Sequence, residues 1–216
     1  MSFHGALDLA GNLAAFALTD DAGTILVDET RPMRGREAAA LAPWLNGLLA
    51  ARDLSVRDVT RWTVGSGPGS FTGMRLASAL VKGWVYGRSG VRTRCVPTAL
   101  IAAAACSAEK ACVLLDGRNH EMLVFGVKRS GEGYLPDGRT EVWNAAQAAE
   151  HLPEAGYAEY AVFSGEEEAA VRALLPAGGG ALTVCARYSA VPLLRAALPF
   201  DDDLDKLVYI RPAVFS

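Results

Sequence analysis

The residues best placed to do chemistry lie in one short segment, Gly65-Ser-Gly-Pro-Gly-Ser-Phe-Thr-Gly-Met-Arg75. The segment follows an apolar run and opens a helical pattern, which is where backbone N–H groups and the helix dipole receive an anion. Its glycines allow close backbone approach, whereas its proline restricts the loop. No Lys-Ser/Thr pair follows the glycines, so this is not a Walker phosphate loop. Two interpretations stay open: a structural turn, in which Ser70 or Thr72 caps the helix, and a binding loop.

A pair of aspartates forms a second candidate site. Asp8 and Asp116 each end an apolar run that predicts a strand. Two such carboxylates facing a cleft would hold magnesium through water. The alternative, which we favour, is that each accepts backbone N–H bonds in its own turn. Arg118 and Glu121 follow the second aspartate and complete the candidate residual cleft, and we expect them to form an ion pair rather than a catalytic dyad.

Composition excludes several classes of site. The chain has 216 residues, a formal charge of −3 and 51% apolar residues, which is typical of a globular protein and gives no electrostatic reason to bind nucleic acid alone. The cysteines form no CxxC pair and the histidines no HxxxH pair, so no metal site is predicted. The free thiols are expected to be reduced and structural; these are Cys95, Cys106, Cys112 and Cys185.

Apolar runs in the chain are short. The longest, Thr98 to Cys106, cannot cross a bilayer, and Asp8 interrupts the apolar start. We therefore expect a cytoplasmic protein without a membrane segment or signal peptide.

Turn residues and apolar periodicity predict an α/β protein. Three short strands separated by turns, a helix, a fourth strand and a second helix are expected. The ranges are Phe3–Leu9, Leu13–Leu18, Thr24–Glu29, Glu37–Ala51, Trp62–Gly65 and Thr72–Gly87. Pro43 either kinks the first helix or marks its first turn.

The same order of elements recurs after a strand at Arg92–Val96, although the sequence itself does not visibly repeat. The ranges are Ala111–Asp116, Met122–Lys128, Arg139–Trp143, Ala145–His151, Tyr160–Phe163 and Glu166–Leu175, the last capped by Ser164. Gly178-Gly179-Gly180 is expected to be a loop. Two βββαβα lobes follow: residues 1–97, and a smaller lobe at 98–216 whose final segment is free to pack back on the first.

Two acidic runs are expected to have no site chemistry. The run Asp201-Asp202-Asp203 with Asp205 predicts a solvated turn or helix start, and Glu166-Glu167-Glu168 predicts an acidic first helical turn.

The second helix is apolar over a wide arc. Small residues recur at four-residue steps beside a stripe of large ones, so the helix is either buried on two sides or awaits a partner. Packing against the first helix is the alternative. The candidate partner-binding residues are Leu41, Trp44, Leu45, Leu48, Leu76, Ala79, Leu80, Gly83, Trp84 and Gly87.

The glycine loop resembles the signature of the bacterial TsaB family, also called YeaZ. The residues that carry the resemblance are Gly67, Pro68, Gly69, Ser70, Phe71, Thr72, Gly73, Met74 and Arg75. Less specific matches follow the family's order along the chain: Ala6-Leu-Asp8, Leu41-Ala-Pro43, Leu115-Asp-Gly-Arg118 with Glu121, and Tyr209-Ile-Arg-Pro212. The resemblance implies the actin-like ATPase fold with two ribonuclease-H-like lobes.

The chain departs from the family pattern at two points. Leu9, Ala10 and Gly11 stand after Asp8, where family members carry a hydroxyl residue, and Glu37 stands at the family's histidine. Without that hydroxyl, a phosphate or magnesium-bound water loses a ligand.

The resemblance implies a non-catalytic subunit of the machinery that makes threonylcarbamoyladenosine in tRNA. Such a subunit docks on a TsaD-type catalytic subunit through its first two helices, reaches tRNA only through the complex, and needs no cofactor. A TsaE-type ATPase is a further implied partner, and a homodimer through the same helices and weak nucleotide binding stay open. The alternatives are an actin-like phosphotransferase or ATPase using Asp8, Asp116 and the glycine loop, and a divergent homodimeric TsaB paralogue.

Overall fold

The computed structural model describes residues 2–33, 39–117, 119–175 and 181–209. These residues form two compact units that divide between Thr98 and Ala99. Unit 1 contains residues up to 98 together with 189–209, and unit 2 contains residues 99–188. The final described segment therefore belongs to unit 1. No helix in the described ranges is both long and apolar enough to span a membrane.

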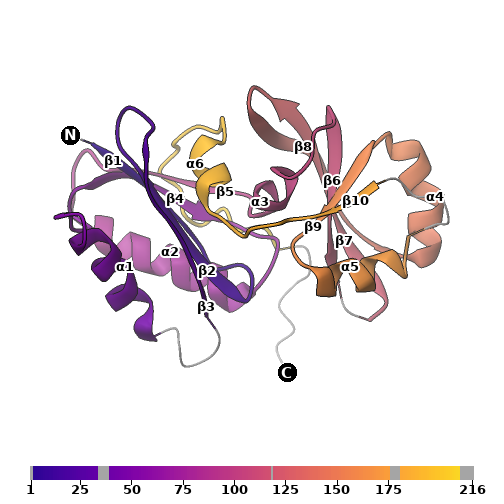
Figure 1. The fold of residues 1–216 in the computed structure, drawn as a ribbon, viewed down its shortest axis with the longest axis horizontal. Helices are drawn as coiled ribbons and strands as arrows, with labels where there is room; N and C mark the ends of the chain where they lie inside the picture. The colour runs from indigo at the N-terminus through magenta and orange to yellow at the C-terminus, as the bar shows by residue number, and fades with distance from the viewer. Residues whose placement is uncertain (1, 34–38, 118, 176–180, 210–216) are drawn as a thin grey trace. The chain divides into compact units, whose positions relative to one another are not determined.

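Unit 1 is built on a five-stranded mixed sheet of order β3-β2-β1-β4-β5 (Figure 1). Its strands are β1 (Phe3–Asp8), β2 (Leu13–Thr19), β3 (Ile25–Pro32), β4 (Val59–Gly65) and β5 (Arg92–Val96). The first three form the antiparallel meander that the turn residues predict, and β4 and β5 add in parallel.

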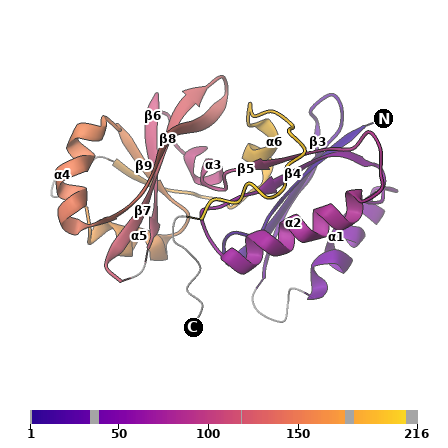
Figure 2. The same ribbon diagram turned by 180° about the vertical axis from the view of Figure 1, so that it is seen from behind.

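Helices cover both faces of this sheet. In Figures 1 and 2, α1 (Leu41–Ala50) and α2 (Phe71–Val85) lie side by side on one face, and α6 (Val191–Arg195) lies on the other. The core under α1 and α2 is centred on Trp62, whose ring lies 6.2 Å from that of Phe16 and 5.2 Å from that of Trp84. Gly5 leaves room for the indole, because a Cβ there would lie 3.1 Å from it.

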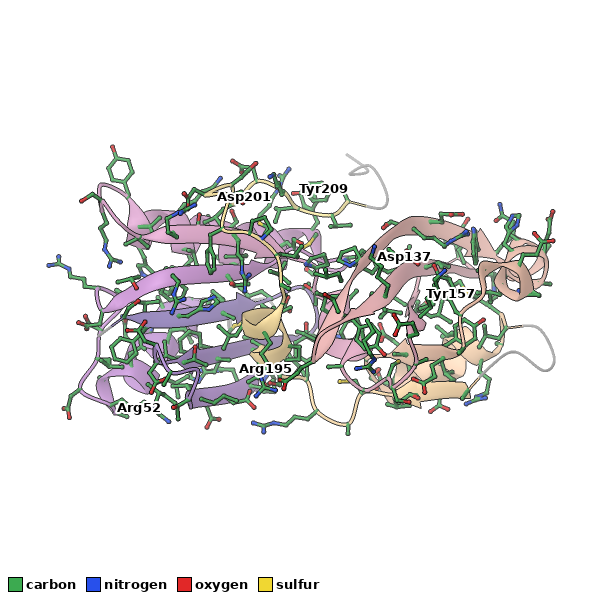
Figure 3. All side chains as sticks on the ribbon, turned by 90° about the horizontal axis from the view of Figure 1, so that it is seen from above. Arg52, Asp137, Tyr157, Arg195, Asp201 and Tyr209 are labelled. Atoms are coloured by element: carbon green, nitrogen blue, oxygen red, sulfur yellow. The ribbon has the colours of Figure 1, made fainter. Side chains whose placement is uncertain are left out.

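Unit 2 repeats the architecture with a sheet of order β10-β9-β6-β7-β8. Its strands are β6 (Lys110–Asp116), β7 (Glu121–Ser130), β8 (Gly133–Asn144), β9 (Glu159–Val162) and β10 (Ala181–Val184), and its helices are α3 (Ala99–Ala103), α4 (Ala145–Ala155) and α5 (Gly165–Arg172). The packed core includes Leu114, Met122, Trp143 and Tyr160. Next to Gly126 of β7, the Tyr157 hydroxyl donates to Asp137 at 2.8 Å, and both side chains are labelled in Figure 3.

The two sheets and the repeated βββαβα order confirm the predicted actin-like, ribonuclease-H-like fold. Of the two candidate caps for the second helix, Ser70 is the one that caps α2, and Ser164 caps α5 as predicted, with an acidic first turn. Pro43 lies in the first turn of α1, which begins at Leu41 rather than at residue 37. The short elements α3, β10 and α6 carry too little periodicity to be predicted. Residues 37 and 178–180 lie outside the described ranges.

The cysteines are free thiols. Burial raises the pKa of Cys95 and of Cys106 to about 12, so these thiols stay protonated at neutral pH and are poor nucleophiles.

A buried arginine fastens the final segment to unit 1. Arg94 on β5 is 3% exposed, and its Nη atoms donate to four backbone carbonyls, those of Leu193, Leu194, Ala196 and Leu198, at 2.5–3.1 Å. These carbonyls lie at and beyond the C-terminal end of α6, where the helix leaves them without partners. Burial lowers the pKa of Arg94 to about 10, so the guanidinium stays charged at neutral pH.

The acidic run after α6 is neither a helix start nor only a solvated turn. Asp202 accepts hydrogen bonds from the Thr93 backbone N–H and from Arg92, both at 2.7 Å, which joins the segment to the edge strand β5. Further along, Asp205 pairs with Lys82 of α2. Figure 3 shows Asp201 and Tyr209 on this returning segment.

His4 makes the stability of unit 1 pH-dependent. Its Nε2 hydrogen-bonds to the Thr63 hydroxyl at 2.8 Å, and burial, aided by Arg94 and Arg61, lowers its pKa from 6.5 to about 3. Between these two values the unfolded chain binds a proton that the folded chain does not, so stability falls as pH decreases.

We predict that His4→Gln flattens this dependence by about 1.4 kcal/mol per pH unit between about pH 6 and pH 4. The check is the free energy of unfolding in urea across that range, with exposed His120→Gln as the control. Equal slopes in wild type and His4→Gln would contradict the assignment.

Candidate functional site

The glycine loop is tied to the strand beside it. The Gly67 N–H donates to the Thr98 hydroxyl at 2.9 Å, and the Thr98 N–H donates to the Gly67 carbonyl at 2.7 Å. Gly67 has φ +93° and precedes a cis peptide bond to Pro68. The Val208 N–H donates to the Ser66 carbonyl at 2.8 Å, so the final segment closes the loop from another side.

The backbone of the turn between β1 and β2 is in close contact with the same loop. The Ser70 N–H donates to the Ala10 carbonyl at 2.5 Å, and a Cβ at Gly69 would lie 2.3 Å from that oxygen. A Cβ at Gly73 would lie 1.9 Å from the Leu9 carbonyl oxygen. One amide near the start of α2 is therefore already used by the protein's own backbone. These contacts favour the structural-turn interpretation over the binding-loop interpretation.

Asp8 also helps to hold the glycine loop in place. Its carboxylate is fully buried, and it accepts from the Ala10 N–H at 3.1 Å and from the Thr98 hydroxyl at 2.5 Å. A Cβ at Gly65 would lie 1.7 Å from the carboxylate, so glycine is required there. The geometry fits the local-acceptor alternative for this aspartate.

The other cleft candidates belong to unit 2. Asp116 ends β6 and is exposed. Glu121 begins β7, and its carbonyl accepts from the Gly117 N–H at 2.8 Å. Arg118 lies outside the described residues. Within the described ranges, no group of His, Cys, Asp and Glu is arranged to hold a metal ion.

Two signature side chains meet a residue from the far end of the chain. The Arg75 guanidinium stacks on Phe71, 3.7 Å from the ring centroid, and its Nε donates to the Tyr209 hydroxyl at 3.3 Å. The rings of Phe71 and Tyr209 lie 5.1 Å apart. Tyr209 is labelled in Figure 3. One sequence signal points to the importance of Tyr209, namely the resemblance of Tyr209-Ile-Arg-Pro212 to the family's C-terminal stretch. Residues 210–212 lie outside the described ranges.

The predicted partner-binding residues separate into core and surface. Leu41 and Leu45 are 1% and 0% exposed, which corrects their assignment: they face the sheet and cannot contact a partner. The predicted end of the second helix is corrected: α2 ends at Val85, and Gly87 lies beyond it with φ +69°, outside the stripe of small residues on the helix. Ala79 and Gly83 are exposed on α2, and a Cβ at Gly83 would have no neighbour within 4 Å.

Partly exposed apolar side chains lie on the same pair of helices. They are Trp44 and Leu48 of α1 and Leu76, Leu80 and Trp84 of α2. We call these five, with Ala79 and Gly83, the helix face. Beyond its end, Tyr86 is 89% exposed. There a surface hollow of about 490 Å³ is lined by Val56, Arg57, Gly83, Trp84, Tyr86 and Arg88.

Sequence comparison decides the family. Residues 36–191 match the family model described as TsaD: tRNA N6-adenosine threonylcarbamoyltransferase. The chain belongs to the TsaD family. No curated protein matches the chain significantly.

Solved structures agree with the family at the level of fold. YeaZ from Pseudomonas aeruginosa has a TM-score of 0.73 and 23% identity, over 90% of this chain and 89% of that one. A protein described as uncharacterized with similarity to peptidase YeaZ, from the same organism, has a TM-score of 0.77 and 22% identity, over 98% of this chain and 100% of that one. The YeaZ resemblance of this TsaD-family chain is thus confirmed.

Two glycines of α2 give opposite predictions for the same substitution. Gly73→Ala should destabilise the protein by about 1–3 kcal/mol, because the methyl group would overlap the Leu9 carbonyl. Gly83→Ala should stabilise it by about 0.5–1 kcal/mol, because alanine favours a helix interior and meets nothing there. Urea unfolding measures the stability of both variants. A Gly73→Ala protein as stable as wild type would rule out the tight contact between Gly73 and the Leu9 carbonyl.

Proposed function

We propose that this chain is a TsaB-type accessory subunit that docks through its helix face onto a TsaD-type catalytic subunit and supports threonylcarbamoyladenosine modification of tRNA. The observation that carries the proposal is the helix face, which presents large apolar side chains around exposed Ala79 and Gly83 on helices whose inner sides already pack on the sheet. Small residues let another backbone approach closely, and the large ones beside them supply apolar area to bury.

Family membership and the YeaZ-like fold support this role. The state of the glycine loop supports an accessory rather than a chemical part in it. A loop that binds phosphate needs free amides at the helix start, and Ser70 gives its amide to Ala10. The tRNA contacts, in this proposal, come from the complex.

The proposal predicts co-purification of a TsaD-type protein with the tagged chain from its own cells, and loss of that protein with Gly83→Leu. Leucine at Gly83 would hold the two backbones apart, at a cost of about 1–3 kcal/mol, or up to about a hundredfold in the dissociation constant. The fold should be unaffected, because the site is open.

The matched control is Gly165→Leu, at an exposed glycine in the first turn of α5 with no neighbour within 4 Å. Calorimetric titration with the purified TsaD-type subunit and thermal melts should be run on both variants. Undiminished binding by a well-folded Gly83→Leu protein would remove α2 from the interface.

We also predict that the isolated chain binds ATP·Mg weakly or not at all and hydrolyses it negligibly. Asp8 is engaged with Thr98 and Ala10, and Leu9 and Ala10 offer no hydroxyl. Calorimetry with ATP·Mg is the measurement. Micromolar binding, with turnover lost in Asp8→Asn, would favour the phosphotransferase alternative instead.

A further inference from the structure

The charge of the two helices that carry the helix face differs from that of the chain. The chain as a whole carries −3, yet α1 has no charged residue and α2 has only Arg75 and Lys82. Beside α1, the edge strand β3 carries Glu29 and Arg31, and the Arg31 guanidinium lies 5.8 Å from the centroid of the Trp44 ring. Neither helix supplies a carboxylate, so the surface offered to a partner is apolar and cationic.

Of the two cations, Arg75 alone has no carboxylate partner among the described residues. Lys82 pairs with Asp205 at 2.5 Å. For Arg75, no carboxylate among the described residues lies within ion-pair distance, and its one hydrogen bond there goes to the neutral Tyr209 hydroxyl. Elsewhere in unit 1, Arg61 and Arg92 have aspartate partners.

Arg75 is also held in place. Its stacking on Phe71 and its Nε hydrogen bond to Tyr209 fix the guanidinium on the exposed side of α2, about one helical turn before Ala79. A fixed guanidinium loses little side-chain entropy when a carboxylate binds, and its remaining N–H groups suit bidentate pairing.

We propose that Arg75 is the charge-specific anchor of the helix face, and that it pairs with a carboxylate on a helix of the TsaD-type subunit. This inference rests on the proposed function. It also predicts partner choice: a second copy of the chain brings no carboxylate from either helix, so the face favours the acidic partner over self-association.

The test is the dissociation constant for the TsaD-type subunit, measured by calorimetry at 50 and 500 mM NaCl. Arg75→Gln should weaken binding about tenfold at low salt, Arg75→Glu should weaken it further, and the salt dependence of Arg75→Gln should be shallower than that of wild type. The control Arg195→Glu makes the same charge change on α6, on the other face of the sheet (Figure 3), and should bind within about twofold of wild type.

A second variant separates positioning from charge. Tyr209→Phe keeps the stacked ring and the Arg75 charge but removes the acceptor at Nε, and it should weaken binding less than Arg75→Gln does. Sedimentation of the isolated chain should show monomers at concentrations where the mixed complex is formed.

The outcomes distinguish the two proposals. If Gly83→Leu abolishes binding and a folded Arg75→Glu binds like wild type, the docking face stands and the charged anchor is overturned. A tight homodimer that persists in Arg75→Glu would overturn the predicted partner choice. If wild type does not bind a TsaD-type subunit, the proposed function fails and this inference fails with it.

Discussion

The start of α2 lies so close to the turn between β1 and β2 that only hydrogen atoms fit between their backbones. The carbonyls of Leu9 and Ala10 point into the loop at positions where any Cβ on Gly69 or Gly73 would overlap them. An unpaired buried carbonyl would be costly, and here the Ser70 N–H satisfies that of Ala10. Gly69 and Gly73 are thus explained by backbone contact, without any ligand.

This contact changes what a strand–loop–helix arrangement can do. In a phosphate-binding loop, the amides at the helix start and a carboxylate on the first strand face a ligand. Here Ser70 and Asp8 bond to the protein itself, and Thr98 links the carboxylate to the loop. The same hydrogen bonds that would order a nucleotide order β1, the loop and α2 against one another. Rigidity at this point positions α2, and α2 carries the helix face.

Much of the fold could be predicted because its signals are local. The strands of both meanders and the caps at Ser70 and Ser164 depend on residues close in sequence, and each was found. The loop's placement between strand and helix was also evident. The face of each helix was harder, because Leu41 and Leu45 have the same residue type and spacing whether a partner or the sheet covers them. Only the position of the sheet decides whether these two leucines are buried in the core or available to a partner.

Contacts distant in sequence could not be predicted. Arg94 in an exposed-looking strand is buried because α6, about 100 residues later, brings carbonyls to it. The composition of the acidic run at 201–203 predicts a solvated turn or a helix start, yet Asp202 hydrogen-bonds to β5. In both cases backbone groups are among the hydrogen-bond partners, and backbone has no sequence signature.

The final segment connects these features. It is fastened at Arg94, at β5 through Asp202, at α2 through Asp205 and at the loop through Val208 before it reaches Tyr209. These attachments are hydrogen bonds and ion pairs, which depend on direction, and Leu204 between them is buried in the core of unit 1. With the segment held in this way, the Tyr209 hydroxyl can hold the Arg75 guanidinium at one place on α2. The position of the Arg75 guanidinium on α2 therefore depends on Arg94, because Arg94 fixes the segment that carries Tyr209. The orientation of α2 is set by the loop at its start and by this segment along its length.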